Sequence, residues 1–285
     1  MKEREWISFH IYTESPIDSI LISYVKVLIE ELTEKRQIKD FFFVRYWEPK
    51  QHIRLRLLAN EGVEDTIKTN IQSYTAAYIK QNPLIELFIS FQIYTPEIER
   101  YGGYQNIISA EKQFCLSSST IISLISENST TWDYSLSIAT AIQMHVILIR
   151  EFCNNDSLLI AQFFQQVYIN WFYYSLKVDE SGNASVEEIT KVQQFFEDSF
   201  MKQKGNLKNI IRLLESDDYI KNTWIYDWKK QCGMINDFFS ESNTDIKILN
   251  YIYDSLIHMS NNRLGIHLRD ESFIAYLINR SITDK

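Results

Sequence analysis

The segment 41–58, FFFVRYWEPKQHIRLRLL, constrains the fold more than any other part of the chain. Aromatic and aliphatic residues flank a polar break that contains Pro49, which is the pattern of two strands joined by a turn. Side chains alternate between the two faces of a strand, so His52, Arg54 and Arg56 share one face and apolar residues the other. Two interpretations of this cationic face are open: a solvated outer face of a sheet, or a preformed site for an anion.

The elements around this hairpin predict a ferredoxin-like unit. A strand is expected at 6–13 and a helix at 16–35, followed by the hairpin, a helix at 63–81 and a strand at 86–95. This order is that of the split βαβ unit, in which two helices cover one face of a four-stranded antiparallel sheet. The first and third strands lie at the centre. The uncovered face then carries mostly polar residues: Ser8, His10, His52, Arg54, Arg56, Ser90, Gln92 and Tyr94.

The rest of the chain predicts helices. They are expected at 104–127, with a weak point at 115–119, and at 133–152, 156–177, from 185 onward, 206–215, 217–239, 244–260 and 270–281. We therefore expect an α+β fold that forms one compact unit. Residues 1–103 form the ferredoxin-like part with the His/Arg strand, and residues 104–285 form a mainly helical part that packs over the site and completes a cleft.

Composition limits the kinds of partner. The chain has 285 residues and a net charge of −8, which argues against a nucleic-acid partner and suits a local cationic pocket. No apolar run is long enough for a membrane span, and the N-terminus lacks a secretory signal. The three cysteines are far apart, as in a cytoplasmic protein with reduced thiols. No metal-binding motif occurs, and His145 has the sequence context of a core histidine.

Two further segments carry candidate functional residues. Arg100 follows the fourth predicted strand, where it either pairs with a neighbouring glutamate at the surface or reaches over the sheet. The segment 255–267, SLIHMSNNRLGIH, ends a helix in hydrogen-bonding residues and contains His258 and Arg263. A histidine in a last helical turn is often there because it interacts favourably with the helix dipole.

An ordered set of motifs resembles a known family. The motifs are Trp6…His10…Tyr12, Arg45-Tyr46, His52-x-Arg54-x-Arg56, Glu99-Arg100-Tyr101-Gly102-Gly103, Glu111…Phe114 and His258-Met259-x-x-Asn262-Arg263-Leu264. Together they resemble the C-terminal, glutamate-elimination domain of class I lanthipeptide dehydratases. The same domain occurs alone in thiopeptide-type bacteriocin biosynthesis proteins, which include thiopeptide pyridine synthases. The resemblance spans nearly the whole chain, so we expect the glutamyl-transferring half of a full dehydratase to be absent.

The resemblance implies an enzyme that acts on a ribosomal precursor peptide with a leader and needs no metal or redox cofactor. The first interpretation is a pyridine synthase. It joins two dehydroalanines of an azole-bearing peptide in a formal aza-[4+2] cycloaddition, and loss of water and of the leader peptide as an amide then gives a macrocycle. The second is the elimination subunit of a split dehydratase, which removes glutamate to leave dehydroamino acids. The third is a non-catalytic peptide-binding member.

One difference from the family favours the pyridine synthase. Elimination domains commonly read His-Met-His before the Asn-Arg pair, whereas this chain has Ser260 in place of the second histidine. A serine hydroxyl cannot move a proton near neutral pH as imidazole does. Azole-forming and dehydratase enzymes are then possible partners, and a homodimer is an open possibility.

The resemblance and the chemistry together assign roles to twelve residues. The expected catalytic residues are Arg54, Arg56, Arg100, Ser260 and His258. The arginines bind carbonyl oxygens or developing negative charge, and Ser260 and His258 move protons. The expected substrate-binding residues are His10, Tyr12, His52, Tyr94, Tyr101, Asn262 and Arg263. The leader peptide is expected to bind in a separate groove, and the sequence does not indicate where this groove lies.

Overall fold

The structure is a computed structural model that describes residues 6–284 except residues 222 and 243. The chain divides into two compact units, Met1–Trp132 and Asp133–Lys285. Helix α4 (Tyr104–Glu127) groups with the sheet in the first unit. The division therefore lies after this helix, whereas the sequence had suggested a boundary before it, at residue 103.

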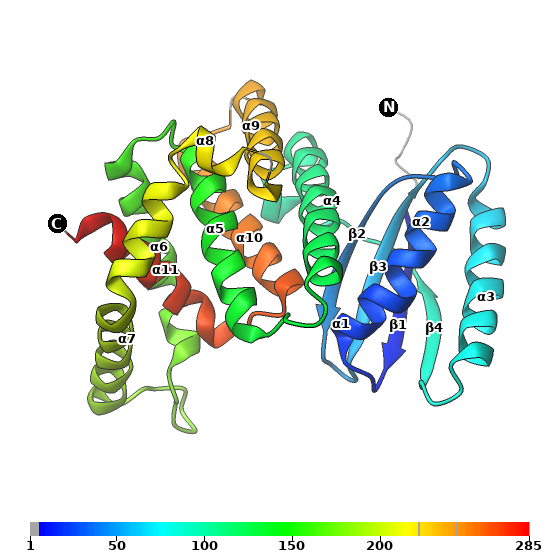
Figure 1. Ribbon diagram of the computed structural model, residues 1–285, viewed down its shortest axis with the longest axis horizontal. Coiled ribbons are helices and arrows are strands. Elements are labelled where there is room, and N and C mark those ends of the chain that lie inside the picture. Colours follow the sequence, from blue (N-terminus) through cyan, green and yellow to red (C-terminus); the bar gives the residue numbers. More distant parts are fainter. Residues whose placement is uncertain (1–5, 222, 243, 285) are drawn as a thin grey trace. The chain divides into compact units, whose positions relative to one another are not determined.

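The sheet of the first unit has the predicted ferredoxin-like topology (Figure 1). Its strands, in the spatial order β2-β3-β1-β4, are β2 (Ile38–Tyr46), β3 (His52–Ala59), β1 (Trp6–Thr13) and β4 (Leu87–Gln92). Ser8 pairs with Arg56 and His10 with Arg54 across the two central strands. Polar residues of both central strands thus share one face, as predicted.

Strand β4 is shorter than expected. Its pairing with β1 ends at the pair Ser8–Gln92, so the backbone leaves the sheet before Ile93. Ile93 is 93% exposed, although the strand predicted at 86–95 would have placed it on the apolar face with Leu87 and Phe91.

The other face of the sheet forms the core of the first unit. It is covered by α1 (Ile17–Ile20), the π-helical turn η1 (Leu21–Lys26), α2 (Val27–Glu34) and α3 (Glu64–Gln81). The strand residues predicted to face these helices are almost fully buried; they are Ile7, Phe9, Ile11, Ile53, Leu55 and Leu57. Complete burial of such a side chain contributes about 1.5–3 kcal/mol.

Helix α4 packs along β2 and follows the short 3₁₀ turn η2 (Glu99–Tyr101). The predicted weak point at 115–119 does not interrupt it. The hydroxyl of Ser117 donates to the backbone oxygen of Gln113 at 2.8 Å, so this buried serine is satisfied within the helix.

The second unit is helical, as predicted. Its elements are α5 (Tyr134–Phe152), α6 (Ser157–Phe172), η3 (Tyr173–Ser175), α7 (Val186–Leu213), α8 (Asp217–Ile220), α9 (Trp224–Glu241), α10 (Ile246–Leu264) and α11 (Leu268–Thr283). The helix expected at 206–215 is instead the end of α7, which continues through Gly205. The helix expected at 217–239 is divided into α8 and α9. Within the described residues, no helix combines the length and the apolar character needed to cross a membrane.

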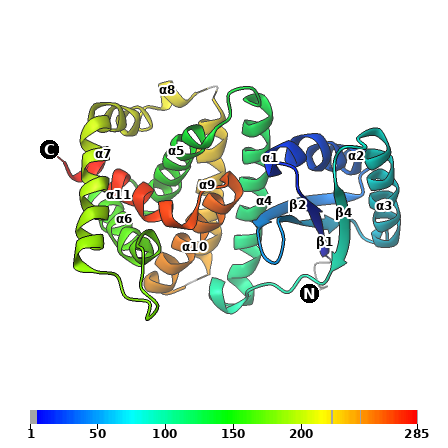
Figure 2. The same ribbon diagram turned by 90° about the horizontal axis from the view of Figure 1, so that it is seen from below.

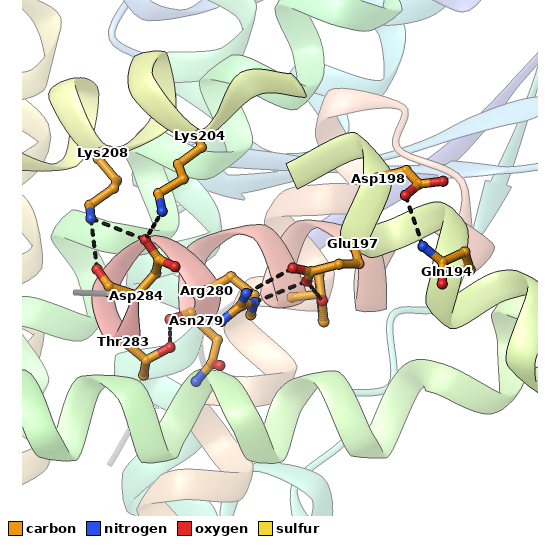
Figure 3. A network of polar contacts seen from close by, with 10 residues as sticks. Gln194, Glu197, Asp198, Lys204, Lys208, Asn279, Arg280, Thr283 and Asp284 are labelled. Carbon is orange, nitrogen blue, oxygen red and sulfur yellow. Dashed lines mark hydrogen bonds and ion pairs between the residues drawn. The ribbon is translucent and has the colours of Figure 1, made fainter. Parts of the chain in front are cut away.

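Helix α11 packs against α6 and α7, and the three lie side by side in Figure 2. Figure 3 shows the polar contacts that join α11 to α7. The Nη2 and Nε atoms of Arg280 donate to the Glu197 carboxylate at 2.8 and 3.1 Å. One turn beyond, Lys204 and Lys208 bind Oδ2 of Asp284 at 2.6 and 3.2 Å. These contacts fasten the C-terminal helix to its neighbour.

Candidate active site

The polar face of the sheet carries a cluster that we call the sheet-face cluster: His10, Tyr12, His52, Arg54 and Arg56. Nδ1 of His52 lies 2.7 Å from the backbone oxygen of Lys50, and Nε of Arg54 lies 3.2 Å from Nε2 of His52. Since Arg54 can only donate, His52 Nε2 accepts and Nδ1 carries the proton. Burial lowers the pKa of His52, so its imidazole is neutral at neutral pH.

The second histidine of the cluster is also neutral. The rings of His10 and His52 stack with centroids 4.8 Å apart. Burial, and then the nearby His52, Arg54 and Arg56, lower the pKa of His10 to about 4. The face therefore carries two cations at neutral pH, both of them arginines.

Arg56 is enclosed by aromatic rings. Its guanidinium carbon lies 4.8 Å from the ring centroid of Tyr94 and 5.2 Å from that of Phe42. Its Nε and Nη1 atoms are buried and form no hydrogen bond with any described residue. Burial lowers the pKa of Arg56 to about 10. A solvated outer face does not describe this arginine, which keeps hydrogen-bonding capacity for a carboxylate or carbonyl oxygen.

A buried acid stands beside Arg56. Glu111, on α4, is 4% exposed and accepts a 3.2 Å hydrogen bond from Nε1 of Trp6. Burial, and then the charge and hydrogen bond of Glu111, raise the pKa of Tyr94 well above its usual range. The guanidinium carbon of Arg54 lies 3.4 Å from the ring centroid of Tyr46.

Two residues expected in the site have other surroundings. The side chain of Tyr101 is 2% exposed and packs edge-on against Phe114, with ring centroids 5.3 Å apart. This places Tyr101 in the core of the first unit, where it cannot touch a substrate. Nη1 of Arg100 lies 3.2 Å from Oε2 of Glu97, which is the surface ion pair considered from the sequence.

The second unit contains a cluster that we call the His258 cluster: Trp171, Asp254, His258 and Glu271. Nδ1 of His258 lies 2.8 Å from Oε1 of Glu271, whose other oxygen accepts a 3.2 Å hydrogen bond from Asn261. The indole of Trp171 stacks on the imidazole at 4.7 Å and 13°, and its Nε1 donates to Asp254 at 2.7 Å. The imidazole is thus held on one edge and on one face.

This geometry leaves one nitrogen of His258 for chemistry. Burial raises the pKa of Glu271, which is 3% exposed, while hydrogen bonds from His258 and Asn261 favour its ionised form. With the carboxylate ionised, Nδ1 carries the proton and Nε2 is an acceptor. The side chain of His258 is 22% exposed. An imidazole that is oriented in this way by a carboxylate can exchange a proton through its other ring nitrogen.

The other polar residues of α10 divide between two sides of the helix. Ser260 is 1% exposed, and its hydroxyl donates to the backbone oxygen of Leu256 at 3.0 Å. Arg263 is fully buried, and its Nη1 donates to the backbone oxygen of Met259 at 2.9 Å. Residues two or five positions from His258 lie on another side of an α-helix. The placement of Ser260 and Arg263 therefore does not support direct contact with a substrate, whereas Asn262 lies on the side of His258.

Sequence reasoning missed Trp171, Asp254 and Glu271. Asp254 stands four residues before His258, so the two share a helix face, and this spacing was the one available signal. Glu271 and Trp171 belong to other helices, and only tertiary packing brings them to His258. Among the described residues, no three potential metal ligands gather closely enough to hold an ion.

A ferredoxin-like sheet that carries two arginines, followed by a helical unit that carries a carboxylate-held histidine, defines an α+β protein. Residues 6–282 match the family described as "Lantibiotic biosynthesis dehydratase C-term", and the chain belongs to this family. The family predicted from the sequence motifs is thereby confirmed.

Individual relatives agree with this family. The chain is 25% identical to "Nisin biosynthesis protein NisB" of Lactococcus lactis subsp. lactis over 97% of its own length, but spans only 25% of that protein. It is 26% identical to "Subtilin biosynthesis protein SpaB" of Bacillus subtilis over 44% of its length and 12% of that protein.

Two solved structures share the fold. The tRNA-dependent lantibiotic dehydratase MibB from Microbispora sp. 107891 matches with a TM-score of 0.67 and 17% identity, over 97% of this chain and 28% of that one. The pyridine synthase TbtD from thiomuracin biosynthesis matches with a TM-score of 0.73 and 11% identity, over 99% and 98% of the two chains. At these identities, the likeness concerns the fold.

Proposed function

We propose that this chain eliminates glutamate from glutamylated serine or threonine side chains of a ribosomal peptide, leaving dehydroalanine or dehydrobutyrine. The observation that carries the proposal is the accessible imidazole of His258, held by the Glu271 carboxylate at 2.8 Å. Membership of the dehydratase C-terminal family supports a role in lantibiotic-type peptide maturation. The proposed reaction starts from a peptide that is already glutamylated.

The reaction needs a base at the α-carbon. Nε2 of His258 takes the Cα proton, a double bond forms between Cα and Cβ, and the bond from Cβ to the ester oxygen breaks. Glutamate leaves as a free carboxylate, and the proton remains on the imidazole. The Glu271 carboxylate stabilises the resulting imidazolium, and the Trp171 ring holds the imidazole in place.

The reaction also needs cations, because a glutamyl ester carries a free carboxylate and negative charge develops on the substrate carbonyl. Within the first unit, Arg54 and Arg56 of the sheet-face cluster are groups that can bind a carboxylate or a carbonyl oxygen. The guanidinium of Arg56 has two donors without a partner among the described residues, and a planar fork of donors suits a carboxylate. The roles of Arg54 and Arg56 in the first unit and of His258 in the second unit are assigned from the chemistry of each side chain.

This proposal puts elimination ahead of the pyridine synthase favoured by the sequence. That preference rested on Ser260 in place of a second histidine. Because Ser260 is buried and hydrogen-bonded to its own helix, its identity carries little information about proton transfer. His258 supplies an imidazole from the accessible side of α10.

The pyridine synthase stays as the second candidate because the fold likeness to TbtD covers nearly all of both chains. In that reaction, Arg54 and Arg56 would bind amide oxygens, and His258 would move the proton of the amide that enters the ring. Glutamate elimination and pyridine formation would use the same side chains. The two reactions can therefore be told apart only by identifying the products.

The test uses a synthetic model peptide in which one O-glutamyl threonine is flanked on each side by four uncharged residues, including Leu and Phe. Mass spectrometry should detect free glutamate and the dehydrobutyrine peptide. A second peptide, with azoles and two dehydroalanines, should be returned unchanged. A macrocycle from the second peptide without glutamate from the first would show a pyridine synthase. No product from either peptide would contradict both candidates.

A further inference from the structure

A groove of about 430 Å³ is formed by residues of α6 and α10 together with the end of α5. Its volume lies within the ~300–1,000 Å³ typical of ligand sites. The floor is apolar and buried, with Phe163 7% and Val167 2% exposed. The rim carries exposed apolar side chains on both sides, with Leu159 48% exposed on α6 and Tyr251 57% exposed on α10.

Carboxamide side chains follow the groove. Gln162, Gln166 and Asn170 stand at four-residue spacing on one face of α6, and Asn250 stands on α10. Nε2 of Gln166 donates to Asn170 at 2.7 Å, and Nδ2 of Asn170 donates to Asp254 at 2.9 Å. Each carboxamide has donors and acceptors, as does each peptide unit of an extended chain. Their spacing along the groove suits a peptide backbone.

The groove carries little charge. Among the described residues that line it, Lys247 in the first turn of α10 and Asp254 two turns later are the charged ones. An apolar floor, carboxamide walls and one charge of each sign favour an uncharged peptide segment with apolar side chains. A polyanion or a strongly charged helix would find no complementary surface there.

The groove ends at the His258 cluster. Asp254 lines the groove, accepts the indole N–H of Trp171 at 2.7 Å, and stands one helical turn before His258. The Trp171 ring stacks on His258. A peptide segment bound in the groove therefore reaches the side of α10 that carries His258, the proposed catalytic base. Contact of this segment with Asp254 can change the position of the Trp171 ring, which in turn holds the imidazole.

We propose that this groove binds an uncharged, extended segment of the peptide substrate next to the residue that is modified. The inference rests on the proposed function, because it takes His258 as the base. Within it, Trp171 and Asp254 are positioning residues. The groove binds the segment that flanks the modified residue, and Asp254 and Trp171 at the end of the groove orient the imidazole of His258.

The test compares two double variants on the same two helices. L159A/Y251A removes both rim side chains of the groove. L158A/I248A is the matched control, since Leu158 and Ile248 are 66% and 44% exposed but do not line the groove. All four side chains are exposed, so both variants should fold, and thermal melting checks this. The probe is the fluorescein-labelled model peptide, with its affinity measured by fluorescence anisotropy.

The rim variant should weaken peptide binding at least tenfold, and the control should stay within about twofold of the unmodified protein. In the elimination assay, the rim variant should raise KM and leave kcat within about threefold, because the rim side chains do not touch His258. Equal affinity for the rim variant and the control would overturn the groove proposal, even if glutamate is released. Weakened binding without any glutamate release would support the groove and contradict the function.

A second readout places the peptide. Gln166→Cys, labelled with an environment-sensitive dye, should change its emission when the model peptide is added, and Gln165→Cys, one position along α6, should not. A second copy of the chain is the competing occupant. If ultracentrifugation shows a dimer that L159A/Y251A abolishes, with no effect on peptide affinity, the proposal is wrong.

Discussion

His258 and Glu271 form a hydrogen-bonded pair between α10 and α11, with Nδ1 of the imidazole 2.8 Å from a carboxylate that is almost fully buried. The pair fixes the tautomer of His258 and leaves Nε2 on the exposed side of the helix. A buried charged pair usually adds little to the stability of a fold. We therefore expect the Glu271 carboxylate to act mainly by orienting the imidazole ring of His258.

The first prediction concerns Glu271. Glu271→Gln keeps the shape of the side chain but removes the charge that stabilises the imidazolium. Glutamate release from the model peptide should fall by about 10²–10⁴-fold in kcat, within the range of general-base catalysis. The melting temperature should change by only a few degrees. Glu187→Gln, at an exposed position in the first turn of α7, is the control. A Glu271→Gln enzyme with normal kcat would show that the pair is structural.

The second prediction concerns Arg56. Its buried donors have no hydrogen-bond partner among the described residues, so the charge stabilises the fold little. Arg56→Met should therefore lower kcat/KM at least tenfold while leaving the melting temperature unchanged or higher. Arg269→Met is the control, because the side chain of Arg269 is 71% exposed. A loss of more than about ten degrees on Arg56→Met would mean that the stacking on Phe42 and Tyr94 holds the sheet together.

The third prediction concerns acid stability. The pKa of His10 is about 4 in the folded state and about 6.5 when unfolded. Between these values the unfolded chain binds more protons, so this contribution to stability is present above pH 6.5 and is lost as the pH falls towards 4. Urea midpoints should therefore fall less for His10→Gln than for the unmodified protein between pH 7 and pH 4.5. An NMR titration of the His10 ring should show its midpoint near pH 4; a midpoint above 6 would contradict the structure.

The fourth prediction concerns the network of Figure 3. Hydrogen bonds from Arg280 and then Tyr276 lower the pKa of Glu197. Its contribution to stability is therefore present above the ordinary glutamate pKa and is lost as the pH falls through the lower folded value. Because Glu197 is partly exposed, Glu197→Gln should cost only about 0.5–1 kcal/mol at pH 7 and nothing near pH 2. Glu187→Gln again serves as the control. A cost that does not change with pH would show that charge is not the cause.

The sheet was largely predictable because its strands and their faces can be identified from short stretches of sequence. Alternation placed Arg54 and Arg56 on one face, and the order of elements placed their strand at the centre of the sheet. The buried acid near Arg56 could not be predicted in the same way, because Glu111 belongs to α4, a helix that follows the sheet in the chain. Tyr101 and Tyr94 were equally good candidates in the sequence. Only the packing of the folded chain shows that Tyr101 is a core residue and that Tyr94 lies beside the guanidinium of Arg56.

The His258 cluster shows why part of a site escapes sequence reasoning. Helical geometry alone sets Ser260 on another side of α10 from His258, and the sequence motif did not take this into account. The partners Glu271 and Trp171 depend on how α11 and α6 pack beside α10, which no local pattern specifies. The groove likewise needs residues from α6 and α10 that are about ninety positions apart in the chain.

The role of His258 as the base of an elimination reaction is tested by the rate at which His258→Gln releases glutamate at saturating model peptide. His267→Gln is the control, since this histidine is exposed and lies in the same segment. His258→Gln should release glutamate at least about a hundredfold more slowly, with peptide affinity and melting temperature unchanged, and His267→Gln should match the unmodified protein. A His258→Gln rate within about threefold of the unmodified protein would show that His258 is not the base.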